Sequence, residues 1–267
     1  MLTDCCVNLL NGQFRIDTKN VLDRAQRAGV SRLILTGTDI ETSRRLIKWL
    51  SPGERYSTAG VHPHYAEETK PGWDEALHEL VRIAGVCAIG ETGLDFNRNF
   101  SSRKSQLICF EQQISLAMEL NKPLFVHDRD SAGAVASTLA IAGQLPDVLI
   151  HCFTGTQADL EIYLDAGYYI GITGWVTDRR RGSLLRELVP LIPLERLLIE
   201  TDAPFLRPHN VPDAWLANNT VSTRHKHRCE PAHLSFVLQA LADIREESLE
   251  NLAQATFANA SRLFKLD

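Results

Sequence analysis

Short apolar runs alternate along the chain with segments whose apolar residues recur every three or four positions. The runs are nearly continuous and rich in β-branched residues, which is typical of parallel strands buried on both faces. We predict eight strands, over residues 5–10, 32–36, 56–61, 86–91, 124–127, 148–152, 168–173 and 197–201.

The intervening segments have the periodicity of helices. Val21, Leu22 and Ala25 fall on one helical face, and Gly29 follows as a C-terminal cap. Similar patterns cover residues 160–164 and 107–118, and two further helices are predicted over 231–244 and 247–264. Residues 203–230 hold several prolines and many polar side chains, so we predict a long loop there.

Eight βα units in a chain of 267 residues predict an α/β fold, the (β/α)8 TIM barrel, as a single domain over 1–267. An open, doubly wound sheet is the alternative. It has no support from a glycine-rich GxGxxG pattern or a Walker motif, because the sequence contains neither.

Composition argues against a strongly basic nucleic-acid binder, a membrane protein and a secreted protein. The chain is 44% hydrophobic and 23% charged, and its net charge of -5 differs from the basic footprint of high-affinity nucleic-acid binders. No apolar run approaches the roughly 18 residues of a membrane span, so no membrane partner is expected. The six cysteines form no C-x-x-C pair and the first residues do not resemble a secretory signal, which favours the cytoplasm.

Reactive side chains follow the ends of five predicted strands. In a closed barrel these ends meet at one mouth, where barrel enzymes build their active sites. The residues are His62, His64, Glu91, His127, His151, Glu200 and Asp202. Imidazoles and carboxylates without a thiolate cluster suit Mg2+, Mn2+, Fe or Zn2+. Two such ions could stabilise the attacking and leaving oxygens of a phosphoryl displacement.

Each of these residues also has a structural interpretation. A histidine at a strand end can be an ordinary loop or core residue, and His62 and His64 flank a proline that suits a surface loop. Glu200 can be a buried carboxylate that orients its neighbours. Asp202 lies nearer the mouth and is our candidate for metal ligand or catalytic base.

Two basic stretches are candidates for contact with phosphate. Residues 178–181 (DRRR) follow the seventh strand near Trp175, and residues 224–228 (RHKHR) follow the eighth. Arg228 precedes a helix start near the mouth, so we predict that it contacts substrate. Trp175 or Tyr65 could stack on a base. The alternative is that both stretches are simply solvated surface.

Several motifs together resemble the TatD family of metal-dependent deoxyribonucleases. They are GVHPH (60–64), IGETGLDFNRNFS (89–101), HDRD (127–130), HCFTG (151–155), GITGW (171–175), LLIETDAP (197–204) and EPAHL (230–234). The resemblance runs nearly end to end in the same order. It implies the barrel of the amidohydrolase-like metal hydrolases.

The resemblance also implies roles for individual residues. Glu91, His127, His151 and Asp202 fall on metal-ligand positions of the family. His62 and His64 fall on a pair that lines the same pocket near the substrate phosphate, and Arg129 is a further phosphate contact. The implied cofactor is Mg2+ or Mn2+, and Zn2+ can occupy such a site in a purified or crystallised sample.

The first strand departs from the common family pattern. Many members carry Asp-x-His-x-His there, whereas this chain has Cys6 and Asn8 at the histidine positions. The branch of TatD proper also lacks the histidine pair. A permanently filled first metal site is therefore not expected, while the second site, from Glu91, His127 and His151, is complete.

We therefore expect a cytoplasmic 3′-5′ exonuclease that acts on single-stranded DNA, with RNA as a further candidate substrate and DNA repair or degradation as its process. Asp202 is the expected catalytic residue, and no obligate protein partner is evident. Two alternatives remain open. One is an ester hydrolase on the same barrel, for example a deacylase of aminoacyl-tRNA. The other is a barrel that binds nucleic acid without cleaving it.

Overall fold

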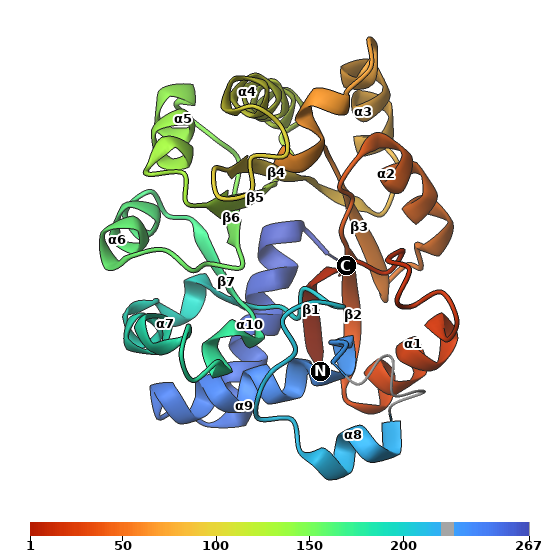
Figure 1. Ribbon diagram of the computed structural model, residues 1–267, viewed down its shortest axis with the longest axis vertical. Coiled ribbons are helices and arrows are strands. Elements are labelled where there is room, and N and C mark those ends of the chain that lie inside the picture. The colour runs from red at the N-terminus through yellow and green to blue at the C-terminus, as the bar shows by residue number, and fades with distance from the viewer. Residues whose placement is uncertain (220–226, 267) are drawn as a thin grey trace.

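The computed structural model describes residues 1–219 and 227–266. Within them, eight strands form one sheet in the order of the sequence, and each strand is parallel to its neighbours. The strands are β1 (Leu2–Val7), β2 (Val30–Leu35), β3 (Arg55–Ala59), β4 (Val86–Asp95), β5 (Leu124–Arg129), β6 (Val148–His151), β7 (Tyr169–Ile172) and β8 (Leu197–Ile199). Figure 1 shows them at the centre of the molecule.

The sheet closes between its first and last strands. Val7 forms a parallel bridge with Ala203, just after β8. The backbone N–H of Asp202 donates to the carbonyl of Cys6 (3.0 Å), and that of Asn8 donates to the carbonyl of Ala203 (2.8 Å). The predicted barrel is confirmed, and the open-sheet alternative is wrong.

Helices surround the barrel (Figure 1). The α-helices are α1 (Thr18–Arg27), α2 (Ile40–Leu46), α3 (Trp73–Val81), α4 (Arg103–Leu120), α5 (Ala134–Ala142), α6 (Gln157–Asp165), α7 (Ser183–Leu188), α8 (Asp213–Asn219), α9 (Leu234–Arg245) and α10 (Leu249–Phe264). Short 3-10 helices are η1 (Ile47–Trp49), η2 (Pro63–Glu68), η3 (Gly174–Thr177), η4 (Val189–Leu191), η5 (Leu194–Arg196) and η7 (Pro231–His233). Among the described residues, none of these helices has the length and apolar character needed to cross a bilayer.

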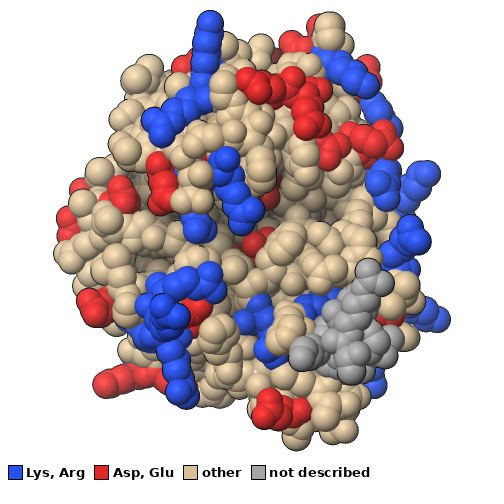
Figure 2. All heavy atoms as spheres, in the orientation of Figure 1, with Lys and Arg blue, Asp and Glu red and all other residues tan. Residues whose placement is uncertain are grey.

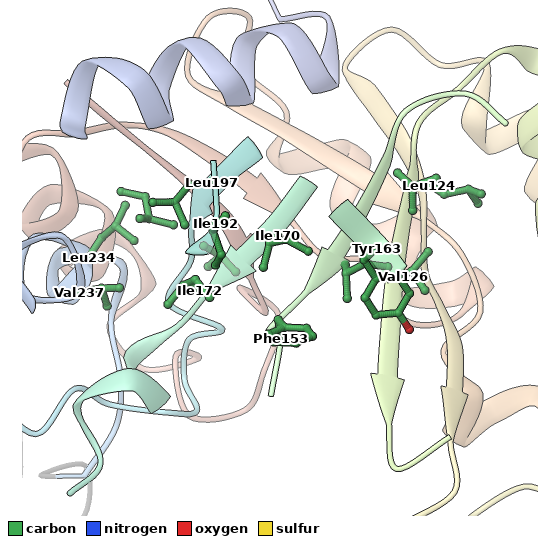
Figure 3. Close-up of a cluster of buried hydrophobic side chains, with 14 of the residues drawn as sticks. Leu124, Val126, Phe153, Tyr163, Ile170, Ile172, Ile192, Leu197, Leu234 and Val237 are labelled. Atoms are coloured by element: carbon green, nitrogen blue, oxygen red, sulfur yellow. The ribbon is translucent and has the colours of Figure 1, made fainter. Parts of the chain in front are cut away.

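The layer between strands and helices is a continuous apolar core. Ile170 and Ile172 of β7 belong to it, together with Leu197 of β8 and Leu234 of α9 (Figure 3). Burial of such side chains is the dominant favourable term in folding. It fixes the distance between each strand and its covering helix, and so the position of the strand ends.

A second apolar cluster contains residues that lie two positions before the reactive histidines of β5 and β6. Phe125 lies two residues before His127, and Leu149 lies two residues before His151. Because side chains two apart on a strand point to the same face, each pair faces the same side of the sheet. The ring of Phe125 also stacks on that of His151, with centroids 4.9 Å apart. His127 and His151 therefore lie directly above buried apolar side chains in the barrel.

Most element boundaries differ from the predicted ones by a few residues, and three of the differences bear on the site or on the loops around it. β1 ends at Val7, because residues 8–17 form turns. β4 continues to Asp95, four residues past its predicted end. The loop predicted over 203–230 contains α8, where Trp215 packs against His233, with ring centroids 4.5 Å apart. This contact between the half-buried Trp215 and the buried His233 stabilises a short helix that the polar composition of the segment did not indicate.

Candidate active site

A cavity of about 650 Å3 opens beyond the carboxyl ends of the strands. Its lining includes seven of the predicted site residues, namely His62, His64, Glu91, His127, Arg129, His151 and Asp202. Figure 2 shows basic side chains around a hollow on this face and acidic atoms within it. The barrel thus brings together residues from five strands or the segments that follow them.

Glu91 lies at the centre of the site. Its carboxylate oxygen Oε1 is 2.9 Å from His127 Nδ1, 3.2 Å from His62 Nε2 and 3.7 Å from His151 Nε2. The backbone N–H of Glu91 donates to the carbonyl of Gly37 (2.7 Å), which holds this part of β4 against the loop after β2. One carboxylate oxygen therefore faces three imidazoles from three different segments.

The charges in the site favour a cation. Burial disfavours ionisation of Glu91, but the imidazoles of His62 and His127 outweigh it and lower the pKa of Glu91 well below its usual range. Burial also opposes protonation of His127 and His151. The surrounding carboxylates overcome this and raise the pKa of His127 to about 9 and that of His151 to about 10. His62 is buried enough that its pKa falls to about 4, so it is neutral, the form in which imidazole binds metals.

Glu200 supports His151 from behind. Glu200 Oε2 lies 2.7 Å from His151 Nδ1 and accepts a hydrogen bond from the backbone N–H of Cys152 (3.1 Å). The carboxylate fits because residue 171 is glycine, since a Cβ there would collide with Glu200 Oε1. This contact leaves Nε2 of His151 directed toward Glu91. Glu200 thus lies where a carboxylate that orients its neighbours would lie, which was one of its two interpretations from the sequence.

Asp202 lies at the seam where the barrel closes. Its Oδ1 accepts hydrogen bonds from Asn8 Nδ2 (2.9 Å) and from the thiol of Cys6 (3.6 Å). Burial, more than any other cause, raises the pKa of Asp202 to about 7. The residue has φ of 54°, a left-handed conformation that is uncommon outside glycine and that often occurs at functional sites.

The donor atoms are spaced as metal ligands are. Atoms that share a cation at about 2.0–2.2 Å lie roughly 3 Å apart. One group joins His62, Glu91 and His127, and a second joins Cys6, His151 and Asp202, each with its ligand atoms within 4.8 Å of one another. In addition, His127 Nε2 is buried and has no hydrogen-bond partner among the described residues. These observations fit a site for one or two divalent cations.

Asp95 was missed by the sequence reasoning. Its Oδ2 is 2.6 Å from His64 Nε2 and 3.7 Å from His127 Nε2. These imidazoles outweigh the effect of burial and keep the pKa of Asp95 far below its usual range. Asp95 is four residues after Glu91, so an extended strand places both on one face. Allowing the predicted strand to continue would have revealed it.

The rim of the cavity carries aromatic and basic side chains. The guanidinium of Arg181 lies 4.3 Å from the ring centre of Trp175, and that of Arg129 lies 5.3 Å from it. Arg181 also pairs with Asp178 (2.7 Å). The predicted neighbourhood of residues 178–181 and Trp175 is therefore present at the mouth.

Arg228 does not reach the cavity, and the prediction that it contacts substrate is corrected. Its side chain is only 1% exposed and pairs with Asp17 (2.8 Å) and Glu230. Arg24 completes this cluster by pairing with the same two carboxylates. A buried guanidinium held by two carboxylates ties α1 to the segment before α9. Residues 224–226 of the same basic stretch lie outside the described residues.

We expect Glu200→Gln to weaken the site without unfolding the barrel. Partners that orient a metal-binding histidine typically contribute about 10–100-fold to metal affinity or activity. Removing one partner of the buried His151–Glu200 pair can itself lower stability, so metal affinity is compared at a temperature where circular dichroism shows that the variant is folded. Calorimetric titration with Mn2+ measures affinity, and the exposed Glu195→Gln is the matched control. Equal Mn2+ affinity in both variants would contradict the orienting role.

Three comparisons place this geometry among known proteins. The model of the family described as "TatD related DNase" matches residues 3–265. A protein from Citrobacter rodentium named "3'-5' ssDNA/RNA exonuclease TatD" is 46% identical over 263 residues, covering 98% of this chain and 97% of that protein. A relative of the same name from Pantoea ananatis is 44% identical over 266 residues, 98% of this chain and 99% of its own length.

Solved structures show the same architecture. A TatD homologue from Escherichia coli superposes with a TM-score of 0.86 at 28% identity, over 100% of this chain and 98% of that chain. A phosphotriesterase homology protein from Escherichia coli, with phosphate in its active site, reaches 0.63 at 13% identity over 98% of both chains. The second likeness shows the fold alone. The fold and the clustered donors together indicate a divalent metal site.

Proposed function

This chain belongs to the TatD related DNase family, and we propose that it is a metal-dependent exonuclease that removes nucleotides from the 3′ end of single-stranded DNA and RNA. The observation that carries the proposal is the Glu91 cluster. Three imidazole nitrogens lie within 3.7 Å of one carboxylate oxygen, at the bottom of a cavity with arginines in its lining.

Glu91, His127 and His151 would hold the principal cation. His62 Nε2 lies 3.2 Å from the same oxygen of Glu91 and could add a further ligand. Such a cation polarises the phosphodiester and lowers the pKa of a water molecule. Asp202 would add a ligand or help hold a weaker second cation together with Asn8. The chain itself contributes metal-binding side chains that already lie close together before the substrate binds.

We propose Mg2+ or Mn2+ as the physiological metal. Carboxylate oxygens with a few imidazoles suit these ions, and the substrate phosphate can supply further oxygen ligands. Burial raises the pKa of the Cys6 thiol well above its usual value, which disfavours its thiolate. Zn2+ is the alternative in a purified sample, because Cys6, His151 and Asp202 form a donor group that suits it.

Asp202 is the proposed catalytic residue. It is the carboxylate at the closing seam of the barrel, and Asn8 Nδ2 keeps its Oδ1 in place. From there its carboxylate can accept a proton from the attacking water. His64, held by Asp95 at 2.6 Å, and Arg129 at the rim would contact the phosphate that is cleaved. Charge-assisted hydrogen bonds of this kind are about twice as strong as neutral ones.

The lining of the cavity suits a flexible polyanion. Arg45, Arg98 and Arg181 lie along it with Arg129, although the whole chain carries a net charge of -5. Trp175 and Tyr65 also line it and could stack on unpaired bases. Local basic side chains around a buried metal site therefore support single strands as the substrate class.

The test is cleavage of defined substrates by the pure protein. We expect strands labelled at the 5′ end to shorten progressively with Mg2+ or Mn2+, and cleavage to stop in EDTA. Duplex DNA, RNA strands and acylated tRNA are assayed in parallel. Activity that persists in EDTA, or deacylated tRNA beside intact strands, would replace the nuclease with another hydrolase. Binding without any product would favour the non-catalytic alternative.

We also propose a cytoplasmic location. All six cysteines are free thiols, and five of them are buried. Reduced thiols are the normal state in the cytoplasm. Fractionation of cells that produce the tagged protein tests this part of the proposal, and recovery in a membrane or extracellular fraction would contradict it.

A further inference from the structure

Phe100 is an apolar ring left exposed at the edge of the active-site cavity. It lines the cavity, and 64% of its surface is accessible. Its ring contact is with His64, at a centroid distance of 4.7 Å and an interplanar angle of 88°. The edge-to-face geometry leaves much of the ring surface uncovered. Single exposed apolar side chains are common on protein surfaces, so the significance of Phe100 comes from its place in the lining of the cavity and its contact with His64.

The segment that carries Phe100 is held in place from both sides. On one side, Asp95 Oδ1 accepts hydrogen bonds from the backbone N–H groups of Asn97 (3.0 Å) and Arg98 (2.8 Å). On the other side, the hydroxyl of Ser101 donates to the carbonyl of His64 (3.0 Å) and accepts from the N–H of Glu67 (3.1 Å). Because the backbone on both sides of Phe100 is fixed, this segment loses little conformational entropy when a ligand binds.

Phe100 also lies one side chain away from the phosphate-contacting residues. Its neighbour His64 is 2.6 Å from Asp95, and the His64 and His62 rings are 4.2 Å apart. His62 in turn is 3.2 Å from Glu91. If a phosphate is held at His64, the sugar of an adjacent nucleotide bridges to the rim, and its base arrives beside the ring of Phe100.

Trp175, Tyr65 and Phe205 are the other aromatic side chains in the lining of the cavity, and each is less exposed than Phe100. Trp175 already has the guanidinium groups of Arg181 and Arg129 within 5.3 Å of its ring centre. Tyr65 is 39% exposed and its ring contacts that of His62 at 6.4 Å. Of the rim aromatics, Phe100 combines the largest exposure with direct contact to His64.

We propose that Phe100 is the stacking platform for the base next to the scissile phosphate and that it determines specificity for unpaired nucleotides. This inference rests on the proposed nuclease function and deepens it. In a duplex, stacking on the neighbouring bases covers the base face that the ring would contact, and base pairing holds the base in that stack. Stacking of one base on an aromatic side chain corresponds to about a 5- to 150-fold effect on binding.

The decisive experiment combines protein variants with abasic substrates. Phe100→Ala, Phe100→Trp and the distant, exposed Ile141→Ala are compared on intact single strands and on strands with an abasic site at each of the last five positions. For an intact strand, Phe100→Ala should lower kcat/KM by about 5- to 150-fold, mainly through KM. Phe100→Trp should retain activity, and Ile141→Ala should match the wild type.

If the effect of Phe100→Ala depends on the position of the abasic site, that position identifies the base that contacts Phe100. An abasic site at one nucleotide flanking the scissile bond should remove the difference between Phe100→Ala and wild type, while other positions should keep it. The preference for single strands over blunt duplex should fall by the same factor. A loss that is equal on every abasic strand, or no loss at all, would overturn the proposal.

A binding measurement separates this proposal from the nuclease function. Fluorescence anisotropy of the same strands in EDTA reports affinity without cleavage. If the wild type cuts no strand but the effect of Phe100→Ala on binding depends on one abasic position, the nuclease function is wrong and the stacking role of Phe100 is supported. If strands are cut and that dependence is absent in both measurements, the platform fails and the nuclease stands.

Discussion

Replacing Glu91 by Gln is expected to lower Mg2+-dependent strand cleavage by at least about 100-fold, beyond the range seen for residues that merely orient ligands. Glu91 Oε1 lies within 3.7 Å of nitrogens of His62, His127 and His151. An amide has the same shape but lacks the negative charge that holds a divalent cation. The rate of shortening of a 5′-labelled strand measures the effect.

The design needs a matched control and a check of the fold. Glu111→Gln changes an exposed glutamate of α4 in the same way and should behave like the wild type. Circular dichroism and Mn2+ titration of Glu91→Gln should show an intact barrel with weakened metal binding. If Glu91→Gln keeps near wild-type cleavage, the metal centre has been placed on the wrong residues.

Replacing Asp202 by Asn should lower kcat by about 100- to 10,000-fold, the usual contribution of a general acid or base. Asp202 reaches the cavity from the closing seam, where the hydrogen bond from Asn8 Nδ2 to its Oδ1 is 2.9 Å long. An amide cannot take a proton from water. Because strand binding depends on other side chains, KM for the strand should change little.

The split between kcat and KM distinguishes catalysis from structure at Asp202. Single-turnover cleavage at saturating protein isolates the chemical step. Asp165→Asn, on the exposed surface of α6, is the control. A loss confined to KM, with the single-turnover rate unchanged, would assign Asp202 to substrate binding instead.

Local patterns revealed much of the site. His127 and His151 end apolar runs, and the period of two along a strand places each on the face of the preceding buried residue, Phe125 or Leu149. Closure of the barrel then brings them together. This is why the predicted residues, except Arg228 and Glu200, line one cavity.

Errors arose where partners come from distant parts of the chain. Arg228 was predicted at the mouth, but its partner Asp17 is 211 residues away in sequence and draws the side chain into the interior. Asp95 was missed because β4 continues past its expected end. Neither ion pairing across the fold nor the continuation of a strand through glycines can be recognised from local composition.

By itself, the sequence determined the architecture and the residue types at the strand ends. The reason is that hydrophobic periodicity is local and repeats eight times. Only the tertiary structure decided which atoms meet. It brought Glu91 to His62, His127 and His151, placed Glu200 behind His151, and left Phe100 exposed. These contacts depend on strand register and on closure of the barrel, which no single segment encodes.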